Sequence, residues 1–132
     1  MQSESSLMKT VLVTDDHAPT NGALCKLLRS CGYETLSALT GEAALAAIGR
    51  QWPDLVILDF MRPGMDGMEV LRLIRMNPDT AFLPVIIYSS IADPEFQKHA
   101  VEKGANDYWL KGGMDFTTLA SMVEKWTASS AA

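Results

Sequence analysis

The chain has 132 residues, a net charge of −5 and a pI of about 4.9. This length suffices for one domain with a full core but is short for two. The hydrophobic fraction of 48% excludes intrinsic disorder. The acidic balance and the scattered basic residues argue against a nucleic-acid-binding surface, which needs clustered Lys and Arg.

The chain carries no apolar run of the roughly 18 residues that a membrane span needs, and "MQSESS" at its start does not resemble a signal peptide. We therefore predict a cytoplasmic protein without membrane contact. The domain is predicted at residues 9–127, between a mobile N-terminal extension (1–8) and a mobile tail (128–132). Cys25 and Cys31 lie in one predicted helix, where they cannot pair, and are interpreted as reduced structural thiols.

Apolar runs alternate with amphipathic runs five times, which is typical of a parallel sheet with helices on both faces. The runs "VLVT", "LVILD" and "VIIYS" are almost continuously apolar or β-branched, so they are predicted to form the centre of the sheet. The fold class is therefore α/β, a doubly wound three-layer sandwich. The predicted strands are Thr10–Thr14, Glu34–Ala38, Leu55–Asp59, Val85–Ser89 and Asp107–Leu110.

The helices between these strands have recognisable ends. The first ends at Gly32, a residue suited to a left-handed C-cap, and the second begins at Thr40. Aspartates are predicted to cap the other three helices at Asp66, Asp93 and Asp115. The apolar stripe of the fifth helix is predicted to contain Phe116, Leu119, Met122, Val123 and Trp126.

Polar side chains follow four of the five strands. In open parallel sheets, ligands bind outside the carboxyl ends of the strands, so these residues are predicted to meet at one edge. They are Asp15 and Asp16 after the first strand, Asp59 at the end of the third, Ser89 at the end of the fourth, and Lys111 after the fifth.

Three clustered carboxylates repel one another and require either raised pKa values or a bound cation. An all-oxygen ligand set favours Mg²⁺, with Mn²⁺ and Ca²⁺ as alternatives, and Mg²⁺ commonly binds phosphate oxygens as well. His17 follows the acidic pair, but imidazole suits a hard cation poorly, so His17 is not predicted to be a ligand.

Phosphoryl chemistry follows from this ligand set, because a carboxylate can act as the nucleophile and form an aspartyl phosphate. Asp59 is the candidate, since it ends a central strand and precedes the turn "FMRPGMDG". Lys111 would neutralise charge on the phosphoryl group, and Ser89 would bond one of its oxygens.

Residues 8–127 resemble the receiver domain of two-component response regulators. The resemblance rests on the pair "DD", on "PDLVILDFMRPGMDG", on "PVIIYSS" and on "GANDYWLK", in this order. It implies a flavodoxin-like (βα)5 fold with strand order 2-1-3-4-5. It also implies a signalling phosphoprotein of a phosphorelay rather than an enzyme, with at most self-catalysed phosphotransfer and autodephosphorylation.

The resemblance implies specific roles. Asp59 would accept a phosphoryl group from a sensor histidine kinase or a histidine phosphotransfer protein. The switch residues would be Ser89 and Tyr108, and they would remodel the face made by the fourth helix, the fifth strand and the fifth helix, where a downstream protein binds. Mg²⁺ would be held by Asp15, Asp16, Asp59 and the backbone carbonyl of Met61.

Two departures from the family pattern stand out. "KGG" replaces the usual Lys-Pro, so we predict a trans bond or a distorted, more mobile loop after Lys111. Ser90 is larger than the small residue usual at its position. Met61 and Ile91, each two residues beyond a site residue, are apolar and are predicted to exclude water and prolong the phosphorylated state.

Four other functions are alternatives to a stand-alone phosphoacceptor. A haloacid-dehalogenase-type phosphatase typically has Asp-x-Asp after its first strand, whereas Asp15 and Asp16 are adjacent. A flavodoxin-like cofactor binder needs a first loop that cradles phosphate, whereas "DDHAPTNG" would repel it. A stand-alone phosphoacceptor remains the leading prediction. A phosphorylation-independent adaptor and a receiver fragment of a hybrid kinase remain open, and the sequence names no kinase, target or process.

Overall fold

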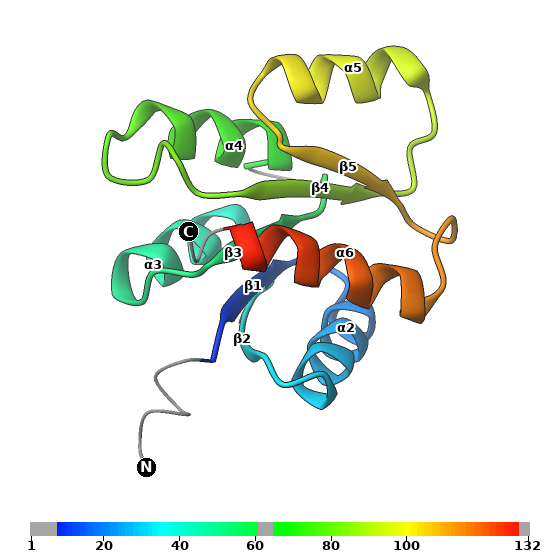
Figure 1. Cartoon of the computed structure of the whole chain (residues 1–132). Coiled ribbons are helices and arrows are strands. Elements are labelled where there is room, and N and C mark those ends of the chain that lie inside the picture. Colours follow the sequence, from blue (N-terminus) through cyan, green and yellow to red (C-terminus); the bar gives the residue numbers. More distant parts are fainter. Residues whose placement is uncertain (1–7, 61–64, 130–132) are drawn as a thin grey trace.

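The computed structural model describes residues 8–60 and 65–129, which form alternating strands and helices (Figure 1). In chain order the elements are β1 (Thr10–Thr14), α2 (Ala18–Ser30), β2 (Glu34–Ala38), α3 (Gly41–Arg50), β3 (Leu55–Leu58), α4 (Gly67–Met76), β4 (Val85–Ser89), α5 (Pro94–Glu102), β5 (Asp107–Leu110) and α6 (Phe116–Ser129).

The five strands form one parallel sheet in the order β2-β1-β3-β4-β5. The register places Leu12 of β1 beside Leu36 of β2 and Val56 of β3. The change of chain direction across the sheet occurs between β1 and β3. In such sheets the loops after these two strands diverge, so a binding crevice is expected at the carboxyl edge. The predicted fold and strand order are confirmed.

Two hydrophobic layers enclose the sheet because side chains alternate along each strand. Helices α3, α4 and α5 cover one face, where Leu12, Val56 and Ile87 are buried. Helices α2 and α6 cover the other face, where Val11, Ile57 and Trp109 are buried. Figure 1 shows the same arrangement, with α3, α4 and α5 on one side of the strands and α2 and α6 on the other. The result is the predicted three-layer sandwich.

The element ends mostly agree with the sequence. Asp66 and Asp93 cap α4 and α5, since their carboxylates accept bonds from Glu69 N–H and Glu95 N–H respectively. Gly32 has φ +96° directly after the C-cap of α2, as a left-handed position requires. Strand β3 ends at Leu58, one residue before the predicted end.

One core prediction is wrong. Phe116 was assigned to the apolar stripe of the fifth helix, but its side chain is 68% exposed. It is the first residue of α6 and lies about one turn before Leu119, the first residue of this helix that is buried. Leu119 and Val123 are buried as expected, and Met122 and Trp126 pack at the margin of the same cluster.

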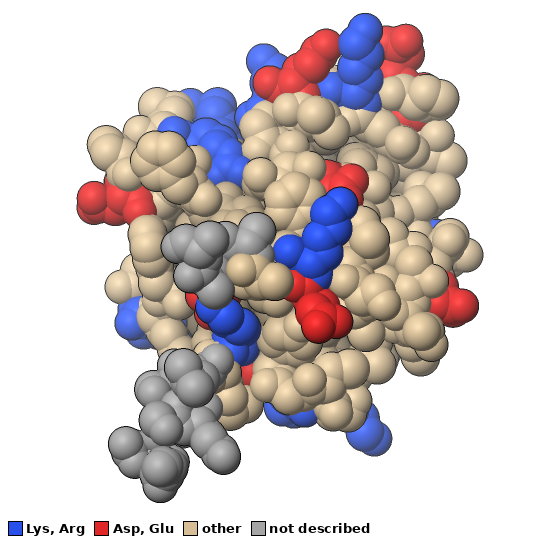
Figure 2. Space-filling model, viewed as in Figure 1, with Lys and Arg blue, Asp and Glu red and all other residues tan. Residues whose placement is uncertain are grey.

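Within residues 8–60 and 65–129, no helix is long and apolar enough to cross a membrane. On the face shown in Figure 2, acidic and basic side chains form small groups separated by uncharged surface. Cys25 is buried and Cys31 is exposed, and both are free thiols.

Candidate functional site

Main-chain hydrogen bonds fix the residues that follow the strands. Asp15 N–H donates to Ala38 O of β2 at 3.0 Å, and Asp59 N–H donates to Thr14 O of β1 at 2.9 Å. On the other side of the crevice, Lys111 N–H donates to the carbonyl of Ser89 at 2.8 Å. Each loop therefore leaves the sheet from a defined point, and the side chains turn into the crevice from fixed backbone positions.

Asp15, Asp16 and Asp59 lie together at this edge, with one ligand atom of each within 4.8 Å of the others. Asp15 is only 3% exposed, Asp59 is half-buried and Asp16 is exposed. The cluster is thus open to solvent on one side and enclosed on the other. Oxygen-only ligands at this spacing fit a small hard cation such as Mg²⁺.

Lys111 joins two of the three carboxylates. Its Nζ lies 2.9 Å from Asp15 Oδ2 and 3.1 Å from Asp59 Oδ1. The second oxygen of Asp15 accepts the backbone N–H of His17 at 2.9 Å, which fixes the rotation of that carboxylate. The predicted meeting of Asp15, Asp59 and Lys111 is therefore present in the structure.

The surroundings shift the pKa values of the paired groups. Burial raises the pKa of Asp59, and neighbouring Asp15 raises it further, while hydrogen bonding to Lys111 opposes both. Burial alone would lower the pKa of Lys111, but its bonds to Asp15 and Asp59 raise it above the ordinary value. Both pKa values are therefore raised, at Asp59 chiefly by burial and at Lys111 because the two carboxylates outweigh burial.

Asn21 of α2 supports the acidic edge and was not identified from the sequence. It is 1% exposed, and its amide donates to the carbonyls of Val13, Asp15 and Ala38 at 3.0–3.3 Å. Its Oδ1 accepts from Ser37 Oγ at 2.7 Å. The signal was available, because Asn21 lies three residues before Leu24 on the buried stripe of its helix, where an amide needs partners.

Gly67 is a second residue that sequence reasoning missed. It is the first residue of α4, and a Cβ added there would lie 2.5 Å from the backbone oxygen of Asp59. Only glycine allows the helix to approach Asp59 this closely. Gly67 is the last residue of the motif "FMRPGMDG", but its close approach to the end of a strand cannot be read from a local pattern.

The two predicted switch residues belong to the same region. Ser89 is 2% exposed, and its Oγ accepts the backbone N–H of Ile91 at 3.1 Å. Tyr108 is half-buried, and its hydroxyl donates to the carbonyl of Ile91 at 2.8 Å. Burial raises the pKa of Tyr108, although hydrogen bonding to Ser89 opposes this. Ser90 is exposed.

The loop after β5 takes the form of a tight turn. Gly113 N–H donates to Leu110 O at 3.0 Å, and Gly112 between them has φ +81°, the pattern of a type II turn. Proline cannot adopt this φ, so "KGG" sets a loop shape of its own. Asp115 nevertheless caps α6 as predicted, accepting from Thr118 N–H at 2.8 Å.

Met61, whose carbonyl is predicted to bind the cation, lies outside the described residues. His17 caps α2, since its Nδ1 accepts from Thr20 N–H, and it does not belong to the acidic cluster.

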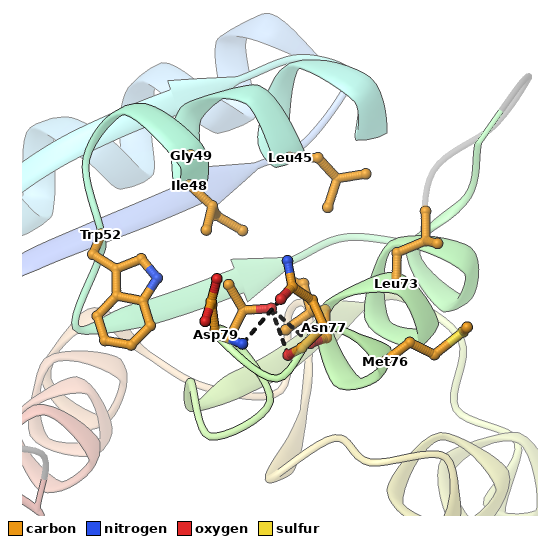
Figure 3. A pocket seen from close by; sticks show the side chains of 10 residues that line it. Leu45, Ile48, Gly49, Trp52, Leu73, Met76, Asn77 and Asp79 are labelled. Atoms are coloured by element: carbon orange, nitrogen blue, oxygen red, sulfur yellow. Dashed lines mark hydrogen bonds between the residues drawn. The ribbon is translucent and has the colours of Figure 1, made fainter.

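A separate hollow of about 610 Å³ lies between α3 and α4 (Figure 3). Its walls are mainly apolar and include Leu45, Ile48, Trp52 and Met76. It lies toward the C-terminal ends of these two helices, and none of the acidic-site residues lines it. The chemistry of the strand ends is therefore not located in this hollow.

Comparison with known proteins gives one consistent result. Residues 11–124 match the model of the protein family "Response regulator receiver domain". The phosphate regulon transcriptional regulatory protein PhoB of Pseudomonas aeruginosa is 35% identical over 103 residues, covering 78% of this chain and 45% of that protein. Response regulator PleD of Caulobacter vibrioides is 35% identical over 101 residues, covering 76% of this chain and 22% of that protein. The chain thus spans less than half the length of these curated relatives.

Solved structures agree. A putative response regulator from Chloroflexus aurantiacus superposes with a TM-score of 0.85 at 33% identity, covering 92% of this chain and 98% of that one. The chemotaxis protein CheY4 of Vibrio cholerae gives a TM-score of 0.83 at 27% identity, covering 89% of this chain and 98% of that one.

Proposed function

The chain belongs to the response regulator receiver domain family, and from this premise we propose that it is a phosphoacceptor that carries a phosphoryl group on Asp59. The observation that carries the proposal is the ammonium of Lys111, which bonds both Asp15 and Asp59 at the carboxyl edge of the sheet. If these residues served only as helix caps and turn formers, the lysine after the last strand would not need to reach the ends of two other strands.

Phosphotransfer to Asp59 replaces one bond to phosphorus with another. One carboxylate oxygen attacks phosphorus, the phosphorus–nitrogen bond of a phosphohistidine breaks, and the leaving imidazole takes up a proton. Lys111 would neutralise negative charge on the transferring group, and the Ser89 hydroxyl would donate to one of its oxygens. The half-buried position of Asp59 supports this role, because a carboxylate held in place loses little freedom when it attacks.

Mg²⁺ is the proposed cofactor, with Mn²⁺ as an alternative. Asp15, Asp16 and Asp59 would hold it, together with the carbonyl of Met61, whose geometry lies outside the described residues. The bound cation would offset the negative charge that the carboxylates and the phosphoryl oxygens bring together.

The proposed partners are a sensor histidine kinase or a histidine phosphotransfer protein on the donor side, and a downstream protein on the face of α5, β5 and α6. Tyr108 lies on β5 between these two helices and is the proposed switch aromatic. We also propose that residues 9–127 are the functional unit and that the protein acts in the cytoplasm.

One alternative has a specific observation behind it. The type II turn at Lys111-Gly112 departs from the family pattern, which fits an adaptor that signals without phosphorylation. A receiver fragment of a longer protein, such as a hybrid kinase, is the other alternative, since the two curated relatives described above are longer than this chain.

The deciding experiment is incubation with acetyl phosphate and Mg²⁺, followed by intact mass spectrometry. We expect the mass of one phosphoryl group to be added, and we expect no addition in Asp59→Asn. Asp79→Asn, an exposed aspartate outside the site, is the matched control and should be labelled normally. Absence of labelling in the wild-type protein would favour the adaptor.

The lifetime of the phosphorylated state remains a prediction from the sequence. If Met61 and Ile91 exclude water, the double variant Met61→Asn/Ile91→Lys should lose its phosphoryl group faster than the wild-type protein in the presence of Mg²⁺. Equal or slower loss would contradict this role.

A further inference from the structure

Three aromatic rings connect the acceptor residue to the last strand. Phe60 directly follows Asp59, and its ring lies 4.9 Å from that of Phe96 on α5, at an interplanar angle of 81°. The ring of Phe96 lies 6.0 Å from that of Tyr108 on β5, at 84°. Both pairs have the edge-to-face geometry that aromatic rings favour.

Each end of this row is connected to the site. The backbone N–H of Phe60 lowers the pKa of the Asp59 carboxyl and so favours its ionised form. The hydroxyl of Tyr108 donates to Ile91 O at 2.8 Å, and Ile91 N–H donates to Ser89 Oγ at 3.1 Å. The three rings therefore connect the segment of Asp59 with Tyr108. The hydrogen bonds through Ile91 connect Tyr108 with Ser89 at the end of β4.

Phe96 also helps to hold α5 in position over the edge of the sheet. Ala100 is the only buried residue within Pro94–Glu102, so this helix contributes little apolar surface to the core. Phe96 is half-buried and contacts a ring on each side. The position of α5 over the sheet edge therefore depends on these directional contacts more than on general packing.

We propose that Phe60, Phe96 and Tyr108 form an aromatic relay in which Phe96 is the positioning residue that holds Tyr108 inward before phosphorylation. Tyr108 already lies against the cluster beneath α3, α4 and α5 with its hydroxyl on Ile91. The unphosphorylated protein thus populates the inward arrangement, and movement of the Asp59 segment is transmitted to β5 through Phe96. This inference rests on the proposed phosphoacceptor function for its meaning, but its first test does not require phosphorylation.

The test uses the full chain labelled with 3-fluorotyrosine, which gives one ¹⁹F signal for each of its three tyrosines. Tyr108→Phe identifies the Tyr108 signal, and its shift between H₂O and D₂O measures exposure. Loss of one edge-to-face contact should raise the outward-to-inward ratio of Tyr108 roughly 2- to 12-fold in Phe96→Leu, without any phosphodonor. An unchanged Tyr108 signal in Phe96→Leu would overturn the proposal.

Phe82→Leu is the matched control, because the same change at a residue 92% exposed should leave the Tyr108 signal unaltered. If Phe82→Leu moved the signal as much as Phe96→Leu, the relay would be rejected. Circular dichroism and thermal melting of both variants would establish that they fold, and Tyr108 signals would be compared only at temperatures well below both melting points.

A second pair of variants tests the order of the relay. Among the described ring contacts, Phe60 reaches Tyr108 through Phe96. The relay therefore predicts that Phe60→Leu exposes Tyr108 in the wild-type background and has no further effect in Phe96→Leu. Additive effects would overturn the relay, since they would mean two independent routes. Mass labelling of Asp59 is measured separately, so failure of the proposed function and failure of the relay give different results.

Discussion

Lys111 places one ammonium within 3.1 Å of two carboxylates that follow different strands. The pKa of Asp59 is raised by burial and by Asp15, and the bond to Lys111 limits this rise. The lysine therefore favours the ionised, nucleophilic form of Asp59 in surroundings that favour its neutral form.

Replacing Lys111 by Met should slow labelling of Asp59 by acetyl phosphate by about 10²-fold, because a charge-stabilising donor is lost from the transferring group. The pKa of Asp59 should rise further in the same variant. Labelling kinetics followed by mass spectrometry, and ¹³C NMR titration of the aspartate carboxyls, would measure the two effects. Lys26→Met, at an exposed position of α2, is the control, and a normal labelling rate in Lys111→Met would refute the assignment.

Asn21 holds three carbonyls and one hydroxyl beneath the acidic edge. Asn21→Ala should lower the free energy of unfolding by about 1–3 kcal/mol, because buried polar groups lose their partners. Urea denaturation would measure this loss. Asn77→Ala removes an exposed amide that water can replace, so we expect it to cost less than about 1 kcal/mol. Equal losses in the two variants would show that the network contributes nothing beyond a surface bond.

The sequence predicted the residues with chemistry but not those that position them. Asp15, Asp59 and Lys111 follow strands, so a rule about parallel sheets brought them together. The roles of Asn21, Gly67 and Phe96 depend on which backbone or ring lies opposite, and no local pattern contains that information.

At the scale of elements, helices α2 and α4 each contain a glycine with a different neighbourhood. A Cβ at Gly22 in the middle of α2 would meet nothing within 4 Å, whereas a Cβ at Gly67 would lie 2.5 Å from Asp59 O. The first glycine weakens its helix without a packing reason, and the second allows a helix to reach the acceptor segment.

Gly22→Ala should therefore raise the free energy of unfolding by about 0.5–1 kcal/mol, through lower entropy of the unfolded chain and better helix propensity. Gly67→Ala should lower it by about 1–3 kcal/mol, because α4 and the Asp59 backbone must separate. It should also slow labelling of Asp59. Chemical denaturation measures both energies, and a neutral Gly67→Ala would contradict the close approach.

Strands and helix caps were the features most completely predicted. All five strands lie where they were predicted, with β3 one residue shorter. The sequence signal is strongest for β1, β3 and β4, because these central parallel strands are buried on both faces. Phe116 failed because periodicity does not show where a helix first meets the sheet. The turn at Gly112 was expected to differ from the family pattern, but its φ of +81° required the structure.

For the whole molecule, the acidic cluster predicts that stability responds to Mg²⁺. Mg²⁺ that binds only the folded chain should stabilise it by about 2.7 kcal/mol at 100 times its dissociation constant. Thermal melting with and without Mg²⁺ would measure this. Asp16→Asn should weaken the response and Asp79→Asn should leave it unchanged, and a wild-type chain without any response would rule out the site.

The Mg²⁺ response should also depend on pH. Because the pKa of Asp59 is raised, the favourable contribution of its protonated form is lost as pH rises through that pKa, so ionised Asp59 opposes folding. Mg²⁺ requires the ionised form. The stabilisation by Mg²⁺ should therefore fade on acidification at a higher pH than an ordinary aspartate, with its pKa of about 3.9, would give. Melting curves across this range, with Asp59→Asn for comparison, would test the shift.

The shared lysine has a further consequence for the charge balance of the crevice. Three carboxylates face one ammonium, which leaves a surplus of two negative charges among the described residues. One divalent cation neutralises these two negative charges, whereas one monovalent cation does not. An incoming phosphoryl dianion then meets a crevice without net repulsion only after that neutralisation, so the two ligands should enter in a preferred order, cation first.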